Sequence, residues 1–178
     1  MQITMDDAFF DLTPYVEYNN DIRQQLSDEF ERQLKLPWTF LSTQNKYDVM
    51  EGMHPFVHEK TIVDQSIEKI IVPDIEPDGK DYWSWQYVEG AIGMPIHKDP
   101  PWSSNCWVAF NVRGDQELDF YDDDKETPIG FINYKLALIN SKVYHAPRSD
   151  GAERLLLRRM FTENNFQQMK DFFISNFS

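Results

Sequence analysis

Short aromatic and β-branched segments, separated by glycine and proline, recur from residue 82 to residue 161 and constrain the fold of this chain most strongly. Side chains of these types fit the half-buried surface of a sheet, and turn residues at intervals of about 8–12 residues are typical of a β-sandwich or barrel. The sequence therefore predicts a mainly β core. Its expected strands cover residues 82–88, 105–112, 117–121, 129–133, 135–140 and 154–161.

Helical patterns flank this core. After the N-cap candidates Asn19 and Asn20, apolar residues recur every four positions, until Leu36-Pro37 ends the pattern. These apolar residues are Ile22, Leu26, Phe30 and Leu34. A second helix is predicted from about Thr61 to Pro73, and a C-terminal helix places Phe166, Met169 and Phe173 on one face. The inward side chains of the second helix are Val63, Ile67, Ile70 and Ile71.

The predicted fold class is α+β, mainly β, in a single domain of residues 1–178. We expect a helical support region over residues 1–80, a β core over 81–162 and a terminal helix over 163–178. A chain of 178 residues is long enough to bury a core without disulfides, and Cys106 is its single cysteine. The N-terminal residues lack a signal-peptide pattern and no segment reaches the roughly 18 apolar residues of a membrane span, so we expect a cytoplasmic protein.

The net charge of −13 disfavours sequence-independent binding to nucleic acid and to anionic membranes, since a negative field repels phosphate groups. One local exception stays open, because Arg148, Arg158 and Arg159 together could form a basic patch. A small-molecule, peptide or protein substrate is the partner that we expect.

Three residues have the pattern of a metal site. His97 and Asp99 are two positions apart in an expected extended segment, so their side chains point to the same face. His145 follows an apolar strand and supplies a third ligand. Two imidazole nitrogens and one carboxylate on one side of an octahedron leave positions for a co-substrate and dioxygen, which is the arrangement of non-haem iron(II) oxygenases.

Arg154 lies nine residues after His145 and opens the next expected strand. A guanidinium grips a carboxylate with two parallel hydrogen bonds, and a buried arginine needs such an anion. Arg158 shares a strand face with Arg154, so it is either the carboxylate clamp itself or a second contact to an anionic substrate. The spacing to His145 favours Arg154.

With His97-X-Asp99, His145 and Arg154 in this order, the chain resembles the 2-oxoglutarate- and Fe(II)-dependent dioxygenases, closest to the prolyl 4-hydroxylase-like branch. The resemblance covers roughly residues 81–161. It implies a double-stranded β-helix (jelly-roll) core and the cofactors Fe(II), 2-oxoglutarate and O2. It also implies that Tyr87 helps to hold 2-oxoglutarate. Asp115-Gln116 replaces the family's usual Gly-Gly before Glu117.

The resemblance implies an oxidoreductase, namely a hydroxylase that releases succinate and CO2. Its expected substrate is a C–H bond of a peptide or protein side chain or of a small metabolite. The alternative is a cupin-like or catalytically silent jelly-roll binding protein. Cupin sites usually contain three or more histidines, whereas the expected core offers two. A purely structural protein, in which the triad is accidental, is the third possibility.

Other residues are weaker candidates. Trp102 and Arg159 are candidate substrate contacts, although Trp102 could equally cap the core. His54 and His58 are more typical of surface or lid-supporting histidines than of half a zinc site. The acidic run 122–124 indicates a solvated hairpin tip rather than a calcium loop.

Overall fold

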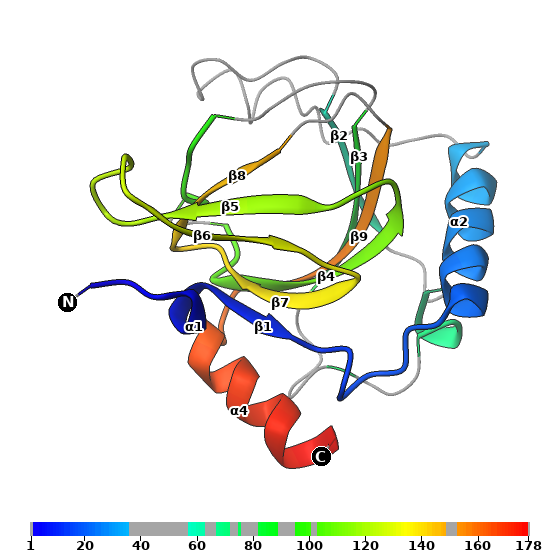
Figure 1. Cartoon of the computed structure of the whole chain (residues 1–178). Coiled ribbons are helices and arrows are strands. Elements are labelled where there is room, and N and C mark those ends of the chain that lie inside the picture. Colours follow the sequence, from blue (N-terminus) through cyan, green and yellow to red (C-terminus); the bar gives the residue numbers. More distant parts are fainter. Residues whose placement is uncertain are drawn as a thin grey trace.

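Two antiparallel sheets form the framework of the protein (Figure 1). The computed structural model describes residues 2–35, 57–62, 67–71, 75, 82–88, 95–100, 103–148 and 153–177. The larger sheet has the strand order β1-β7-β4-β9-β3-β2, and the smaller sheet has the order β6-β5-β8. In the larger sheet the strands are β1 (Phe9–Asp11), β2 (Val57–Ile62), β3 (Tyr82–Val88), β4 (Cys106–Arg113), β7 (Leu136–Asn140) and β9 (Arg154–Phe161). The smaller sheet consists of β5 (Glu117–Tyr121), β6 (Pro128–Asn133) and β8 (Tyr144–Pro147).

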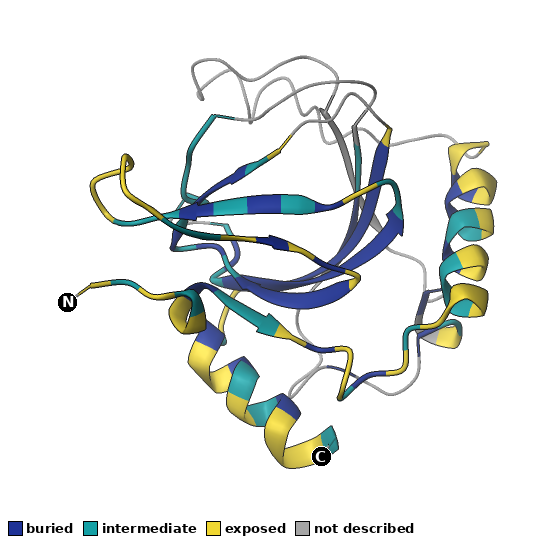
Figure 2. Ribbon diagram, in the orientation of Figure 1, coloured by how far each residue is buried: buried dark blue, intermediate teal, exposed yellow. Residues whose placement is uncertain are grey.

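Strands β4, β7 and β9 of the larger sheet are buried on both faces (Figure 2). Its inner face packs against the smaller sheet, in an inner core that contains Trp107, Ala109, Leu156 and Met160 of the larger sheet and Phe120 of the smaller. Its outer face packs against the helices. That outer core includes Trp85, Val108, Phe110, Leu155, Leu157 and Phe161. Because neighbouring residues of a strand point to opposite faces, residues of β4, β7 and β9 alternate between the two cores.

The helical segments of the described residues are α1 (Met5–Ala8), α2 (Asn20–Leu34), the 3₁₀ helix η1 (Ile67–Lys69) and α4 (Phe166–Phe177) (Figure 1). Helix α2 begins where the Asn19 side chain accepts a hydrogen bond of 2.9 Å from the backbone N–H of Ile22. Its buried Phe30 ring lies 5.3 Å from the ring of Trp85. In addition, the Trp85 indole N–H donates a 3.1 Å hydrogen bond to the Gln33 side chain. Helix α2 therefore covers the outer face of β3.

The expected mainly β core is confirmed, and its six predicted strands begin and end within one residue of the observed ones. The helix expected after Asn19 and Asn20 and the C-terminal helix are also present, the latter with Phe166, Met169 and Phe173 buried. Among the described residues, no helix is long and apolar enough to cross a lipid bilayer.

The N-terminal region, which was expected to be a helical support region, contains strands as well as helices in its described part. Thr61 lies in β2 rather than at the start of a helix, and the described helical part of that segment is the short η1. Strands β1 and β2 pair with β7 and β3 and so extend the larger sheet at both edges. These pairings join segments far apart in sequence, which is why the local pattern of apolar residues did not indicate them.

Gly114 makes the connection from β4 to β5 possible. Its φ of +74° lies in the left-handed region, where residues with a Cβ are strained. A Cβ at this position would also collide with the backbone carbonyl oxygen of Glu153. Gly114 thus provides the backbone freedom that the chain needs where it passes from β4 in the larger sheet to β5 in the smaller sheet.

We expect Gly114→Ala to lower the free energy of unfolding by about 2 kcal/mol or more, because it adds both backbone strain and a backbone collision. Urea denaturation followed by circular dichroism measures this change. The matched control is Lys125→Gly, which removes a side chain from a positive φ of 64° in an exposed turn. That variant should be neutral or slightly more stable; equal destabilisation by both changes would contradict the assignment.

Candidate metal centre

A backbone bridge brings the two histidines together. The His97 N–H donates to the His145 carbonyl at 3.0 Å, and the His145 N–H donates back to the His97 carbonyl at 2.9 Å. This exchange defines an antiparallel pair, in which the two side chains project from the same face. The segment around His97 thereby lies beside β8, which pairs on its other side with β5.

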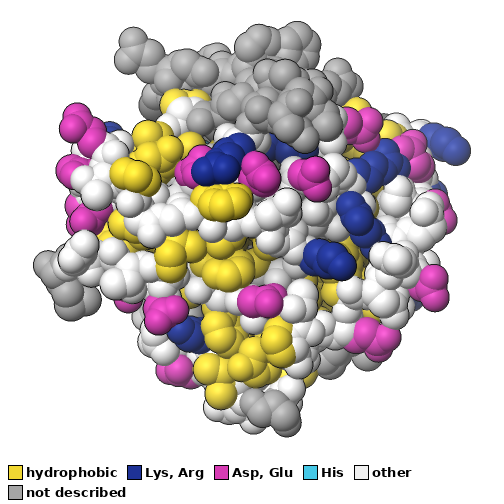
Figure 3. Space-filling model, in the orientation of Figure 1, with side chains coloured by type: hydrophobic (Ala, Val, Ile, Leu, Met, Phe, Trp, Pro, Cys, Tyr) yellow, Lys and Arg dark blue, Asp and Glu magenta, His cyan; other side chains and the backbone are white. Residues whose placement is uncertain are grey.

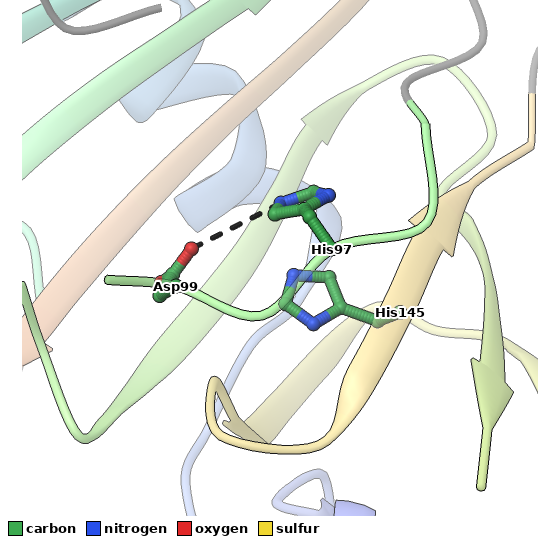
Figure 4. A group of neighbouring side chains, drawn as sticks. All are labelled: His97, Asp99 and His145. Carbon is green, nitrogen blue, oxygen red and sulfur yellow. Dashed lines mark ion pairs between the residues drawn. The ribbon is translucent and has the colours of Figure 1, made fainter. Parts of the chain in front are cut away.

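The ligand atoms of His97, Asp99 and His145 all lie within 4.8 Å of one another (Figure 4). The two imidazole centroids are 4.5 Å apart, and His97 Nε2 is 3.9 Å from the nearer Asp99 carboxylate oxygen. Asp99 follows His97 by two residues in an extended segment, so its carboxylate returns to the same side. The three residues that the sequence indicated therefore converge on one point.

Each imidazole is oriented by a carbonyl two residues before it. His97 Nδ1 lies 2.8 Å from the Pro95 oxygen, and His145 Nδ1 lies 2.9 Å from the Val143 oxygen. A carbonyl only accepts hydrogen bonds, so a proton on each Nδ1 satisfies both contacts and leaves the Nε2 lone pairs for a metal ion. Burial, and then the neighbouring His97, lower the pKa of His145 from 6.5 to about 4. At neutral pH its imidazole is therefore uncharged, as metal binding requires.

The turn from β7 to β8 anchors the ligand segment. The Asp99 N–H donates to the Ser141 carbonyl at 2.9 Å. The Lys142 ammonium donates to the carbonyls of Pro100, at 2.9 Å, and Asp99, at 3.4 Å. Lys142 thus fixes the backbone of a candidate ligand without touching its carboxylate.

Two arginines face the inner core. Arg154 and Arg158 alternate along β9 with the residues of the outer core, so they share a face with Leu156 and Met160. Both are buried. The Arg154 guanidinium donates to the Arg148 carbonyl at 2.7 Å, and the Arg158 guanidinium is 3.4 Å from the Ser84 hydroxyl. The structure therefore brings both candidate carboxylate clamps to the side of the sheet that bears the triad.

Tyr134 is a neighbour of both arginines that the sequence did not single out. It is buried in the inner core, and burial raises the pKa of its hydroxyl, which the charges of Arg158 and Arg154 oppose. A neutral phenol here is a hydrogen-bond donor for a bound anion. It lies between two predicted strands, where strand alternation does not indicate which way a side chain points.

Two other sequence-predicted residues lie on the opposite face. Tyr87 packs in the outer core, with its ring 5.4 Å from that of Phe30, instead of beside Arg154. Arg159 stacks over Trp83 at 5.2 Å, again on the outer side. The alternation Trp83, Trp85, Tyr87 in the sequence is the signal that could have placed Tyr87 with the outer aromatic residues.

The remaining candidates do not join the triad in the described part of the chain. Trp102 and His54 lie outside the described residues, and His58 belongs to β2. Cys106 is buried in the outer core. The acidic run 122–124 forms the turn between β5 and β6, where the Asp124 carboxylate accepts hydrogen bonds from Thr127.

The three arginines of the suggested basic patch are separated. Arg148 lies at the surface, where its guanidinium binds the Asp119 carboxylate at 2.6 and 2.7 Å and stacks over Phe131. Arg158 and Arg159 are buried on opposite faces of β9. On the face shown in Figure 3, acidic and basic side chains are scattered among hydrophobic ones. These arginines therefore form no common surface patch.

Fold and site together define a mainly β protein of two antiparallel sheets with a candidate metal centre of two histidines and one aspartate. No protein-family model matches the sequence, and no curated protein matches it. Among solved structures, AviO1 from Streptomyces viridochromogenes Tue57 is similar over 86% of this chain and 90% of that one, with a TM-score of 0.53 and 10% identity. At this identity the likeness shows a shared fold and no more.

Weaker similarities connect the chain with cupin proteins. A cupin 2 conserved barrel domain protein from Rhodopseudomonas palustris gives a TM-score of 0.39 at 10% identity, over 61% of this chain and 63% of that one. Oxalate decarboxylase from Bacillus subtilis, a protein with Mn(II) centres, gives 0.41 at 12% identity, over 63% of this chain and 27% of that one. The chain spans less than two thirds of the length of both, and at such TM-scores neither likeness establishes the fold.

The metal-free protein should lose stability as the pH falls from about 6.5 to about 4, in part through His145. Its pKa is lower in the folded protein than in the unfolded chain, so the unfolded state takes up the proton first and acid favours unfolding. The contribution is on the order of 2–3 kcal/mol. Urea denaturation at pH 7 and pH 4.5 should show a smaller loss for His145→Gln than for the wild type; an identical loss would refute this role.

Lys142→Met should weaken metal binding about tenfold, because it frees the backbone of the segment that carries Asp99. Titration with Co(II), followed by its visible absorption, measures the affinity. Lys98→Met is the matched control, since Lys98 is adjacent to both ligands but its ammonium pairs with Asp123 at 2.6 Å. Equal affinities for the two variants would exclude a positioning role for Lys142.

Proposed function

We propose that this protein is an Fe(II)- and 2-oxoglutarate-dependent oxygenase with a double-stranded β-helix (jelly-roll) core. It would hydroxylate a C–H bond of a peptide or protein side chain or of a small metabolite. The observation that carries the proposal is the convergence of His97, Asp99 and His145, with ligand atoms within 4.8 Å. The buried arginines on the inner face of β9 add the second element that a dicarboxylate co-substrate requires.

The donor set fits iron(II). Two neutral nitrogens and one carboxylate oxygen form the facial triad that non-haem iron(II) oxygenases use, and the same set also accepts other divalent first-row ions. Among the described residues the cluster has these three members, which leaves coordination positions for exogenous ligands. Bound iron(II) and 2-oxoglutarate would supply the chemistry by which O2 oxidises a C–H bond to an alcohol while 2-oxoglutarate becomes succinate and CO2.

The chain's own residues bind, orient and exclude water. Carbonyl contacts at both Nδ1 atoms hold the imidazoles in the metal-binding tautomer. Arg154 is the residue that we assign to the distal carboxylate of 2-oxoglutarate, since a buried guanidinium binds a carboxylate with two hydrogen bonds. The Tyr134 hydroxyl, close to the same arginine, would donate a further hydrogen bond. Phe120 and Trp107 lie beside His145, with ring centroids 6.5 and 6.3 Å away, and shield the centre from solvent.

Anaerobic titration of the protein with Fe(II) and 2-oxoglutarate tests the proposal. The expected result is a weak visible charge-transfer band and, in air, slow conversion of 2-oxoglutarate to succinate without added substrate. His97→Ala should abolish both, because it removes a metal ligand. Retained succinate formation in His97→Ala would contradict the assignment of the protein as a 2-oxoglutarate-dependent oxygenase. A wild-type protein that binds Fe(II) but shows no band with 2-oxoglutarate would instead support a cupin-like metal protein.

Arg154→Gln should raise the Kd for 2-oxoglutarate at least tenfold and leave Fe(II) binding unchanged, because it removes the charge that pairs with the distal carboxylate. Arg159→Gln is the matched control, being on the same strand but on its outer face. Its Kd for 2-oxoglutarate should stay within twofold of that of the wild type. Unchanged binding in Arg154→Gln would mean that another cation binds the distal carboxylate of 2-oxoglutarate.

A further inference from the structure

The Arg154 side chain reaches from one sheet to the other. Arg154 is the first residue of β9 in the larger sheet, and its Nη1 donates a 2.7 Å hydrogen bond to the backbone carbonyl of Arg148, directly after the end of β8 in the smaller sheet. An arginine side chain has several rotatable bonds, so a guanidinium that binds an anion loses conformational entropy. A hydrogen bond that holds the guanidinium before the anion arrives reduces this loss. The position of the Arg148 carbonyl therefore affects how well Arg154 can bind a carboxylate.

Arg148 is held by contacts to both other strands of the smaller sheet. Its backbone N–H donates to the Glu117 carbonyl of β5 at 3.0 Å. Its guanidinium Nε and Nη2 donate to the two carboxylate oxygens of Asp119, also in β5, at 2.7 and 2.6 Å. The same guanidinium lies over the Phe131 ring of β6, 4.1 Å from the ring centroid. These contacts fix the side chain and the backbone of Arg148 together, and with them the carbonyl that accepts from Arg154.

Asp119 has a rigid backbone from which to hold that side chain. It lies in the middle strand of the smaller sheet, opposite Phe131 of β6 and Ala146 of β8. Its neighbours Leu118 and Phe120 belong to the inner core, so the Asp119 carboxylate projects from the outer face. A carboxylate that receives two parallel hydrogen bonds from a guanidinium fixes the plane of the guanidinium as well as its distance.

The ion pair between Asp119 and Arg148 is open to water. The Asp119 side chain is 20% exposed and the Arg148 side chain is 43% exposed. Ion pairs in such positions contribute little to the free energy of unfolding, because solvent screens their charges. A change in this pair is therefore expected to act on the position of the Arg148 carbonyl more than on folding.

We propose that Asp119 and Arg148 are positioning residues for the co-substrate site. Arg148 holds the Arg154 guanidinium through its backbone carbonyl, and Asp119 holds Arg148 through its carboxylate. Neither the Asp119 nor the Arg148 side chain touches the co-substrate, since the pair lies on the outer face of the smaller sheet. The inference rests on the proposed function for the identity of the ligand, a dicarboxylate that Arg154 binds at one end. It makes the affinity for this ligand depend on an ion pair outside the site.

Asp119→Asn separates positioning from simple electrostatics, because the two effects have opposite signs. Removing a negative charge from the protein would strengthen the binding of the anion 2-oxoglutarate if charge alone mattered. Loss of the charged fork should instead raise the Kd for 2-oxoglutarate about threefold to tenfold, because Arg154 is less well held. Anaerobic titration of the Fe(II)-loaded protein with 2-oxoglutarate measures this Kd. The Kd for Fe(II) should stay within about twofold of that of the wild type, because the metal ligands are unchanged.

Glu117→Gln is the matched control for the change in charge. The Glu117 carboxylate is 3.9 Å from Arg148 Nη1, so this variant removes an equal charge beside the same guanidinium but leaves the hydrogen bonds to Asp119 intact. Its Kd for 2-oxoglutarate should equal that of the wild type or be lower.

Phe131→Thr disturbs Arg148 without any change in charge. It removes the ring beneath the guanidinium, so it should raise the Kd for 2-oxoglutarate in the same direction as Asp119→Asn but by a smaller factor. If Asp119→Asn does not fold, this variant tests the proposal in its place. A Kd equal to that of the wild type in Phe131→Thr would then count against the proposal.

A double variant tests whether Asp119 acts through Arg154. In an Arg154→Gln protein the Arg148 carbonyl has no guanidinium to hold, so the addition of Asp119→Asn should change the Kd for 2-oxoglutarate by less than about twofold. Additive losses in the double variant would overturn the proposal. A Kd in Asp119→Asn alone that is unchanged or lower than that of the wild type would also overturn it.

The Nη proton resonances of Arg154 provide a measurement that needs no co-substrate. Rotation about the Cζ–Nη bonds slows when the guanidinium is held, and the Nη protons then give resolved signals in proton–nitrogen correlation spectra. We expect resolved Arg154 signals, assigned by their absence in Arg154→Gln, in the wild type and in Glu117→Gln. In Asp119→Asn they should be broadened by exchange, whereas identical signals in Asp119→Asn and the wild type would contradict the positioning role.

Failure of the proposed function has a different signature from failure of this inference. A wild-type protein that binds Fe(II) but not 2-oxoglutarate would refute the proposed function. The Arg154 resonances would then still decide whether Asp119 and Arg148 position its guanidinium.

Discussion

The pair of backbone hydrogen bonds between His97 and His145 is the constraint on which the candidate site depends. These residues are far apart in the chain, and their imidazole rings lie 4.5 Å apart. The exchange of two hydrogen bonds, at 3.0 and 2.9 Å, fixes both the distance and the side on which the imidazoles project. Asp99, two residues after His97, has its side chain on the same side because alternate residues of an extended segment share a face. The Lys142 ammonium binds the backbone carbonyls of Asp99 and Pro100. The site is therefore built by backbone pairing first and by side-chain chemistry second.

Strand alternation explains which functional residues were predictable. His97, Asp99 and His145 were identified from residue types and spacing alone, and the structure brings them together. Tyr87 was assigned to the co-substrate through resemblance, although its own alternation with Trp83 and Trp85 places it among the outer aromatic residues. Where a family pattern and the period of the strand disagreed, the period was the better guide, because a strand cannot turn one side chain to the other face without shifting its register.

The features that the sequence did not indicate are those fixed by contacts over long distances in the chain. Strand β1 has three residues and is stabilised through its pairing with β7, more than a hundred residues later. The end of strand β2 was taken for the start of a helix, because the apolar residues after Thr61 share a helical period. The Lys142 contacts and the position of Tyr134 depend on turns, whose side-chain directions follow from tertiary packing and not from any local period. Local patterns thus predicted the central strands well but did not indicate β1 and β2, the strands at the two edges of the larger sheet.

The chain as a whole is acidic, whereas its inner core contains the positively charged side chains of Arg154 and Arg158. A net charge of −13 describes the solvated surface, where acidic groups are screened by water and ions within about 10 Å. Arg154 and Arg158 lie in the inner core, where screening is weak and a single cation acts strongly on its neighbours. An acidic surface therefore does not prevent a small anion from binding inside. Its negative charge repels large polyanions more strongly than it repels a small acid. The distribution of charge thus favours a small acidic ligand over nucleic acid.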